Sequence, residues 1–195
     1  MIVADIEASG LDYRRHSLLS IGAVDMKNPE RQFYGECRMW DGATTMSDSL
    51  AVTGFSEEDC IDPKKQSLEE LMQNFLRWVE QCEDKTLAGH NTSFDRDYLN
   101  DSFSRTHIGW HFSYRTLDLH SIAYMDMLKR GIPIPMKNDR AEISLTTILE
   151  HVGLPPEPKP HNGLTGAQLE AEAFSRILYG KNLLPEFAQY PLKNS

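Results

Sequence analysis

Apolar residues recur along the 195-residue chain with two different spacings, first strand-like and then helix-like. Runs rich in Leu, Ile, Val, Phe and Tyr cover residues 2–8, 17–26 and 31–39, and this composition is typical of strands. A turn signal, Asn-Pro-Glu, stands at 28–30. We therefore expect the second and third strands to form a hairpin.

Helical periodicity begins at residue 68 and continues to 81, and Ser67 with Glu70 matches a capping box at its start. Further along, the pattern predicts short strands at 86–89 and 114–117, and helices at about 94–104, 119–129, 144–153 and 165–178. Hairpin strands come first and strand–helix alternation follows. This order predicts an α/β fold with a mixed five-stranded sheet flanked by helices on both faces.

Four stretches lack either pattern. Residues 41–66 are polar and irregular, which is long for a structureless connection and favours a functional loop. Residues 132–142 resemble a loop, and four prolines between 155 and 160 predict a stiff linker before His161. The last stretch, 181–195, has no clear pattern. We expect residues 1–180 to form one domain and 181–195 to be its C-terminal extension.

Composition excludes several classes of protein. Hydrophobic residues make up 40% and charged residues 25% of the chain, which is neither a disordered nor a membrane composition. We find no apolar stretch that reaches the roughly 18 residues of a spanning helix, and no signal-peptide pattern. The three cysteines (Cys37, Cys60 and Cys82) are far apart, so neither a disulfide framework nor a thiolate zinc site is expected. A reducing cytoplasm is the expected location.

The net charge restricts how this chain can meet nucleic acid. Twenty Lys and Arg against 29 Asp and Glu leave a charge of −9. Such a chain is not a general polyanion binder that works by bulk charge. A role on nucleic acid therefore requires a local device, such as cations bound at a confined site.

The first predicted strand carries two acids. Asp5 and Glu7 are two residues apart, so both side chains leave the same face of a strand. Two carboxylates on a mostly apolar strand are costly unless something neutralises them, and Mg²⁺ prefers oxygen ligands. A solvent-facing position on an edge strand would explain the pair equally well.

Two later residues carry candidate chemistry. Asp95 falls in the first turn of a predicted helix, where an acid is also common because it interacts favourably with the helix dipole. His161 precedes the last predicted helix and can accept a proton from a water nucleophile if it lies near a metal site. Taken alone, each residue is explained better by a bland role than by a catalytic one: a favourable contact with the helix dipole for Asp95 and a solvated loop position for His161.

The order of these segments resembles a known family. Residues 5–11 (DIEASGL), 89–99 (GHNTSFDRDYL) and 161–167 (HNGLTGA) follow one another at characteristic separations. Together they are similar to the motifs of the DEDDh family of 3′–5′ exonucleases. That family lies within the ribonuclease H-like superfamily and includes proofreading subunits of bacterial replicative polymerases, ribonuclease T and oligoribonucleases. The resemblance extends from residue 2 to about 178 and implies an exonuclease domain with a ribonuclease H-like fold.

The resemblance also implies a mechanism. It places two Mg²⁺ or Mn²⁺ ions on Asp5, Glu7 and Asp95, with His161 as general base and Glu7 also counted among the catalytic residues. Attack on the terminal phosphodiester would release nucleoside 5′-monophosphates from the 3′ end of DNA, or of RNA. Two divalent cations would also reverse the negative field where phosphates bind.

Substrate contacts follow from the same resemblance. Ser9, Gly10 and Leu11 occupy positions that meet the 3′-terminal nucleotide in the family, although Leu11 could instead belong to the core. Thr53 and Phe55 lie in a segment similar to one beside the terminal nucleotides, and Phe55 could either stack on a base or pack beneath its own loop. The implied partner is nucleic acid with a free 3′ end, single-stranded DNA being favoured over RNA. A homodimer or a polymerase partner is compatible with the resemblance, and no membrane partner is expected.

The third motif departs from the family at one position. The family has an Asp five residues after the His, whereas this chain has Gly166, so the fourth carboxylate of the family name is missing. Glu170, one helical turn further on, could compensate, or water could fill the place. The expectation is an enzyme that is weakened by this loss. The alternative is a nucleic-acid-binding module that keeps the exonuclease fold without turnover.

Overall fold

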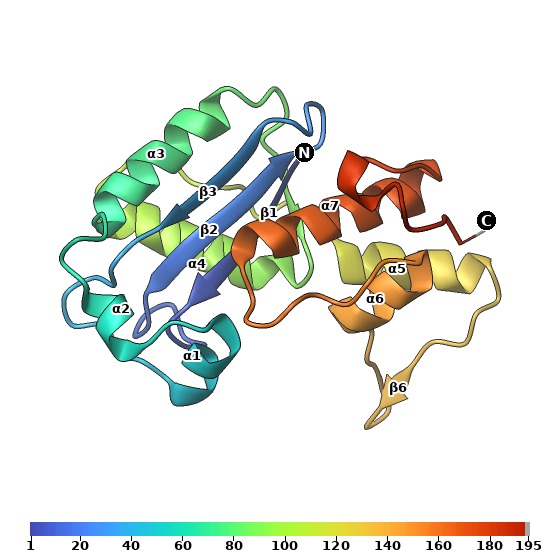
Figure 1. Ribbon diagram of the computed structural model, residues 1–195, viewed down its shortest axis with the longest axis horizontal. Helices are drawn as coiled ribbons and strands as arrows, with labels where there is room; N and C mark the ends of the chain where they lie inside the picture. The colour runs from blue at the N-terminus through green and yellow to red at the C-terminus, as the bar shows by residue number, and fades with distance from the viewer. Residues whose placement is uncertain (194–195) are drawn as a thin grey trace.

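A mixed sheet of five strands forms the centre of the computed structural model, which describes residues 1–193 (Figure 1). The strand order is β3-β2-β1-β4-β5. β1 pairs antiparallel with β2 and parallel with β4, and β4 pairs parallel with β5, so the predicted α/β architecture is confirmed. The strands span Ile2–Ala8 (β1), Leu18–Asp25 (β2), Gln32–Glu36 (β3), Leu87–Gly89 (β4) and Leu117–Asp118 (β5).

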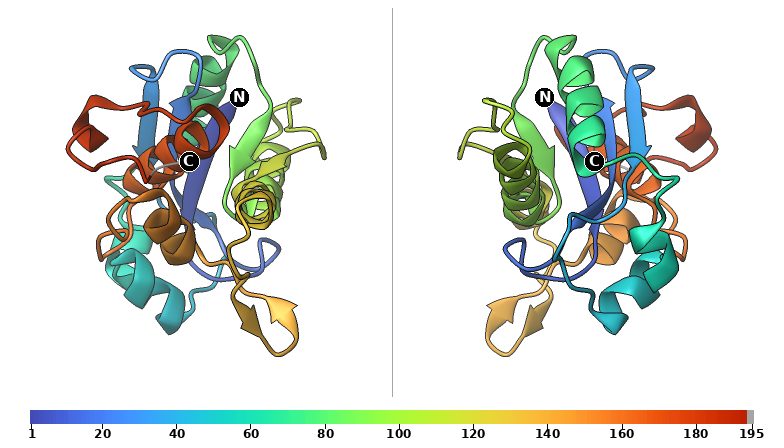
Figure 2. Two further views of the ribbon diagram at one scale, coloured as in Figure 1. Left: turned by 90° about the vertical axis from the view of Figure 1, so that its right-hand side faces the viewer. Right: turned by 90° about the vertical axis from the view of Figure 1, so that its left-hand side faces the viewer.

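Helices cover both faces of this sheet (Figure 2). Alternate residues of β1 divide the core between the two faces, since Ile2, Ala4 and Ile6 pack in one buried cluster and Val3 in the other. The first cluster contains residues of α3 (Leu68–Glu80) and α4 (Thr92–Arg105). The second contains residues of α5 (Leu119–Lys129), α6 (Leu145–Val152) and α7 (Gly163–Tyr179).

Residues 41–66 are more regular than the sequence pattern predicts. They hold two short helices, α1 (Ser47–Thr53) and α2 (Glu57–Ile61). α1 ends at Gly54, whose φ of 76° is left-handed, and α2 begins with a complete capping box between Ser56 and Asp59. Both helices are too short to show a hydrophobic period in the sequence. The capping interactions at their ends therefore determine where they form.

Three other predicted boundaries also need correction. The predicted loop at 132–142 contains a two-stranded hairpin, β6 (Met136–Lys137) and β7 (Arg140–Ala141), which projects from the body of the molecule (Figure 2). Its turn residues both have positive φ, as a type I′ hairpin turn requires. The fifth strand lies at 117–118 instead of 114–117, and residues 185–187 form a 3-10 turn within the C-terminal stretch.

The first turn of α7 docks unusually close to the sheet because glycines meet there. A Cβ added at Gly22 of β2 would lie 2.0 Å from the carbonyl carbon of Gly163. A Cβ added at Gly163 would lie 2.8 Å from the backbone oxygen of Asp5. Any side chain at either position would push the helix away. The pair of glycines therefore holds the start of α7 against β1 at the level of Asp5.

Two further findings concern membrane-spanning helices and the cysteines. Within residues 1–193, no helix combines the length and apolarity needed to span a membrane. All three cysteines are buried and free.

Candidate active site

Three acids meet where the parallel strands β1 and β4 end. Asp5 and Glu7 leave the same face of β1 as Val3, and β1 is an inner strand of the sheet, so the edge-strand explanation for the pair is wrong. The β1–β4 pairing covers only the first residues of β1, and beyond it the Ile6 N–H donates to Oδ1 of Asp95 at 3.2 Å. Asp95, in the first turn of α4, is thereby fixed beside the two acids of β1.

Two more acids border this group. Glu170 of α7 is 3% exposed, and its Oε2 accepts a hydrogen bond from the backbone N–H of His90 at 3.1 Å. Glu157 lies in the proline-rich segment before α7, with Oε2 3.5 Å from Nδ1 of His161. Its Oε1 is buried and has no hydrogen-bond partner within the described residues. The site therefore contains buried carboxyl groups from two helices, one strand and one loop.

Burial is the main electrostatic influence on these acids. It raises the pKa of Glu7 to about 8 and the pKa values of Asp95 and Glu157 to about 7. Burial, followed by repulsion from Glu170 and then Asp95, also raises the pKa of Asp5 well above its usual range. The pKa of Glu170 rises for the same reason, burial first and then Asp95. Gathered carboxyl groups that resist ionisation are a common feature of functional sites.

The donor set fits a hard divalent cation. Carboxylate oxygens are the preferred ligands of Mg²⁺ and similar ions, and the unpartnered Oε1 of Glu157 is an oxygen that such an ion would satisfy. Single ligand atoms of Glu7, Glu157 and His161 all lie within 4.8 Å of one another. Asp5, Glu7 and Asp95 are thus brought together as predicted, and with Glu157 they could hold cations.

His161 borders the acids from the start of α7. Its backbone N–H donates to the oxygen of Val52 at 3.0 Å, which joins the segment before α7 to α1. Burial, with a smaller contribution from the positive charge of Lys159, lowers the pKa of the imidazole. Its side chain keeps 31% exposure. A neutral, accessible imidazole beside Glu7 is placed to accept a proton, so the description as a merely solvated loop residue does not apply.

An apolar cavity of about 330 Å³ opens beside Glu7. Leu11 stands at its edge with 70% exposure, so the core alternative for Leu11 is wrong. Phe94, which precedes Asp95 in α4, lines it as well. Its wall also includes the predicted residues Gly10 and Thr53. The remaining wall residues come from β1, from α1 and from the residue before α1: Ile6, Ala8, Met46, Asp48, Ser49 and Val52.

Two predicted substrate contacts have other roles. Ser9 is completely buried, and its hydroxyl donates to the oxygen of Thr44 and accepts from the N–H of Ser17. Ser9 is therefore not available to substrate, because its polar groups hold the turn after β1. Phe55 packs against a small buried cluster and carries the Lys65 ammonium over its ring at 4.3 Å. Its packing beneath its own loop is confirmed, although it still lines a second cavity together with His161.

Asp118 and Glu157 are two further acids near this site. Asp118 caps α5 by accepting from the N–H of His120 and also accepts from the N–H of Thr92, so it supports the start of α4. Its charge also contributes to the raised pKa values of Asp95 and Glu170. Glu157 is missed by the sequence interpretation. Its only signal is an acid within a proline-rich run, four residues before His161.

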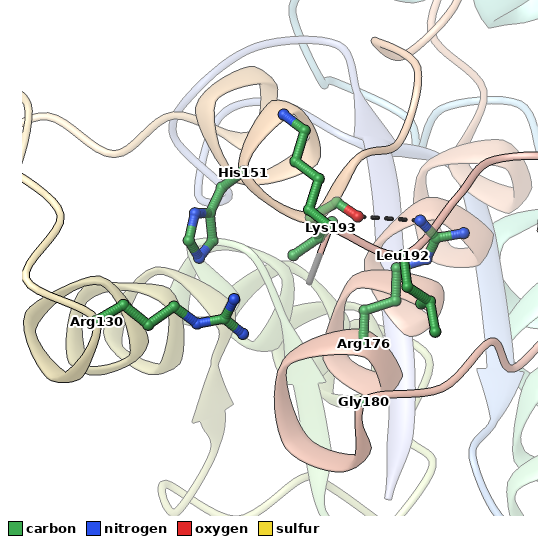
Figure 3. Close-up of a pocket in the computed structure, with 7 residues that line it drawn as sticks. Arg130, His151, Arg176, Gly180, Leu192 and Lys193 are labelled. Atoms are coloured by element: carbon green, nitrogen blue, oxygen red, sulfur yellow. Dashed lines mark hydrogen bonds between the residues drawn. The ribbon is translucent and has the colours of Figure 1, made fainter. Parts of the chain in front are cut away.

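A separate basic pocket lies near the C-terminal end of α7 (Figure 3). Arg176 there pairs with Glu172 at 2.8 Å, and both Arg130 and His151 contact Asp126. Lys193 donates to the backbone oxygen of Glu150. Gly180, in the wall of this pocket, is 14 residues beyond Gly166, about 20 Å along a helix. The pocket is thus a seam that anchors the C-terminal segment and is remote from the acids.

The raised pKa values predict how pH and cations affect stability. In the unfolded chain these carboxyl groups ionise near pH 4, whereas in the folded protein Glu7 stays protonated up to about pH 8 and Asp95 up to about pH 7. Between these limits the folded state binds more protons, so stability without cations falls as pH rises from about 4 to about 8. We expect the Tm to decrease across this range.

Cations should reverse this loss. Mn²⁺ at a fixed concentration, chosen as 100 times its Kd at pH 8, stabilises the folded state at that pH by roughly 2.7 kcal/mol, or roughly 5 °C or more for a chain of this size. The gain should be larger at pH 8 than at pH 5, because protons compete with the cation at low pH. Differential scanning fluorimetry with and without Mn²⁺ measures both effects. An identical gain at the two pH values would contradict binding at these carboxyl groups.

Comparison with known proteins agrees with this site. Residues 2–174 match the model of the RNase T exonuclease family. The chain is 25% identical over 178 residues to the PolC-type DNA polymerase III of Thermotoga maritima, which covers 91% of this chain and 12% of that protein. It is 28% identical over 112 residues to the DNA polymerase III subunit epsilon of Buchnera aphidicola subsp. Schizaphis graminum, which covers 53% of this chain and 45% of the relative. The chain thus spans less than half the length of both relatives.

Solved structures share the fold. E. coli exonuclease I in complex with a dA16 oligonucleotide aligns with a TM-score of 0.70 at 15% identity, over 92% of this chain and 40% of that one. The nuclease domain of 3′hExo, a DEDDh family member bound to rAMP, aligns with a TM-score of 0.69 at 14% identity, over 100% of this chain and 96% of that one. The ribonuclease H-like fold expected from the motifs is therefore confirmed.

Proposed function

Because the chain belongs to the RNase T exonuclease family, we propose that it is a cation-dependent 3′–5′ exonuclease that releases nucleoside 5′-monophosphates from DNA. The observation that carries this proposal is the convergence of Asp5, Glu7 and Asp95 beside an accessible His161 and an apolar cavity. We assign residues 1–180 to the exonuclease domain and 181–195 to its extension.

In this proposal the acids bind the cations, and one of them also borders the cavity for the substrate. Asp5, Glu7 and Asp95 would hold two Mg²⁺ or Mn²⁺ ions. When bound, the ions lower the pKa of a coordinated water and stabilise the charge on the departing oxygen. The protein supplies the placement: the Ile6 N–H fixes one carboxylate oxygen of Asp95, and the close docking of α7 covers Asp5. Glu7 also lines the apolar cavity, so it joins the acids to the space proposed for the terminal nucleotide.

His161 would accept the proton of the attacking water. Its Nδ1 faces Oε2 of Glu157 at 3.5 Å, which leaves Nε2 for the water. Protonation of the ring would create a positive charge beside the Glu157 carboxyl group, an arrangement that stabilises the imidazolium. The lowered pKa of His161 keeps the base in its neutral, receptive form at neutral pH.

The substrate class follows from the cavity and the relatives. Apolar walls from Leu11, Val52 and Phe94 fit an unpaired base, because a base exposes a flat apolar face when it is unstacked. The two polymerase relatives act in DNA synthesis by name, and exonuclease I is seen with a DNA oligonucleotide. We therefore favour single-stranded DNA over RNA. The same relatives favour a polymerase partner and action in the cytoplasm.

Cleavage of a 5′-labelled oligonucleotide tests this proposal. With Mn²⁺ or Mg²⁺ present, the label should move through a ladder of shorter products, and the released product should be the 5′-monophosphate. A matched RNA strand should be degraded more slowly. Retained oligonucleotide binding without any shortening would favour the binding module that Gly166 suggests instead.

Leu11 provides a test of the cavity. Truncation of this exposed side chain in Leu11→Ala removes roughly 1 kcal/mol of apolar contact with the terminal base, so KM should rise roughly fivefold while kcat changes little. Leu178→Ala is the matched control, because Leu178 is 43% exposed near the far end of α7. Steady-state kinetics on a short DNA strand separate the two constants. Equal KM values for both variants would remove Leu11 from the substrate site.

A further inference from the structure

Gly166 leaves a gap that two acids already fill. A Cβ added at this glycine would lie 1.9 Å from Oδ2 of Asp5 and 3.2 Å from Oε1 of Glu157. A side chain at this position would thus collide with the carboxyl group of Asp5 where it now stands. The place that the family gives to its fourth carboxylate is occupied here by groups from β1 and from the loop before α7.

The position of Glu157 differs from that of an ordinary loop acid. Its side chain is 11% exposed although it lies between prolines in a surface segment. One oxygen faces His161, and the other, Oε1, is buried beside Gly166 without a hydrogen-bond partner in residues 1–193. A buried carboxylate oxygen without a partner costs free energy unless a ligand satisfies it. The oxygen is thus placed for a ligand.

We propose that Glu157 supplies the fourth carboxylate of the cation site in place of the residue missing at 166. This inference rests on the proposed function, since it assumes that Asp5, Glu7 and Asp95 hold cations. Glu157 reaches this position from the loop, four residues before His161. An aspartate at residue 166 would reach the same position from the first turns of α7. The exchange of Asp for Gly at 166 is then coupled to the acid at 157, and the site keeps four carboxylates.

Glu170 is less suited to this role. Its Oε2 accepts from the His90 N–H and lies 3.2 Å from where a Cβ of Gly89 would stand. Glu170 is therefore held at the end of β4 by this hydrogen bond, although its charge raises the pKa of Asp5 more than the charge of any other acid does. The gap at Gly166 borders Asp5 and Glu157. Compensation by Glu170, considered from the sequence, is the second candidate, because the atoms nearest to a Cβ at Gly166 belong to Asp5 and Glu157.

Direct measurement of Mn²⁺ binding tests the proposal without relying on activity. Glu157→Gln keeps the shape of the side chain and removes its charge, and Glu157→Asp keeps the charge but withdraws the oxygens. We expect both variants to bind Mn²⁺ at least about tenfold more weakly than the parent protein, since even outer-shell changes cost that much. Electron paramagnetic resonance of free Mn²⁺ gives the affinities. Glu186→Gln, in the C-terminal segment, is the matched control and should bind like the parent.

The outcomes separate this proposal from the proposed function. If the parent protein itself binds no Mn²⁺ above the level of Asp5→Asn, the cation site as a whole fails. If the parent binds Mn²⁺ and Glu157→Gln binds it equally well, only the role of Glu157 is overturned. Unchanged affinity with slower turnover would make Glu157 a positioning residue for His161, which also overturns the proposal. Thermal melting without cations should show both variants folded.

Discussion

Asp5→Asn should lower the rate of 3′-end removal by on the order of 10³-fold. The substitution keeps the size of the side chain but removes a carboxylate whose place lies among Glu170, Asp95, Glu7 and Glu157. Cation catalysis contributes several kcal/mol to the stabilisation of the transition state, and each 1.4 kcal/mol corresponds to a factor of ten in rate. Initial rates on a labelled single-stranded DNA, at saturating Mn²⁺ for the parent protein, measure the effect.

The fold of this variant should be intact. Removal of one acid from a repelling group relieves unfavourable burial, so the Tm of Asp5→Asn without cations should equal or exceed that of the parent. Asp97→Asn is the control, because Asp97 lies on the same helix as Asp95 and pairs with its neighbour Arg96. If Asp5→Asn kept more than a tenth of the parent rate, the Asp5 carboxylate would contribute roughly 1.4 kcal/mol or less to the stabilisation of the transition state. The role of Asp5 as a cation ligand would then be rejected.

His161→Ala should reduce kcat by on the order of 10²-fold to 10³-fold, the usual contribution of a general base. The side chain faces Glu157 and keeps 31% exposure, so its removal leaves the apolar cavity beside Glu7 unchanged. We therefore expect the Kd for an oligonucleotide to change less than roughly threefold. Single-turnover kinetics, combined with binding measured in Ca²⁺, separate the two quantities.

A histidine elsewhere on the surface provides the control for this variant. His111 is exposed and lies outside the acidic group, so His111→Ala should leave kcat unchanged. A loss of affinity in His161→Ala that accounts for the whole rate loss would assign the side chain to substrate binding instead of proton transfer.

Much of the fold follows from patterns visible in the sequence. The strands β1 and β2 and the helix α3 coincide with their predicted ranges to within one residue, because the two strands are apolar runs buried on both faces and the helix buries a periodic apolar face. The hairpin β6–β7 and the helices α1 and α2 are missed. They are short, and turn geometry or end caps specify them in place of hydrophobic periodicity.

In the site, too, some positions follow from the sequence and others do not. Asp5 and Glu7 are predicted to share a face, and they do so because strand geometry fixes the direction of alternate side chains. The position of Glu157 has no such rule, since a loop brings it to the acids and only the packing of the segment before α7 determines where it points. Ser9 is predicted from a motif position, yet its hydroxyl is used within the turn after β1.

Anomalous diffraction from crystals soaked in Mn²⁺ and a nucleoside 5′-monophosphate tests the central proposal most directly. The proposal predicts Mn²⁺ peaks within bonding distance of the carboxylate oxygens of Asp5, Glu7 and Asp95, with the phosphate of the nucleotide on the same ions. Crystals with ordered nucleotide but without Mn²⁺ peaks beside these three acids would contradict it.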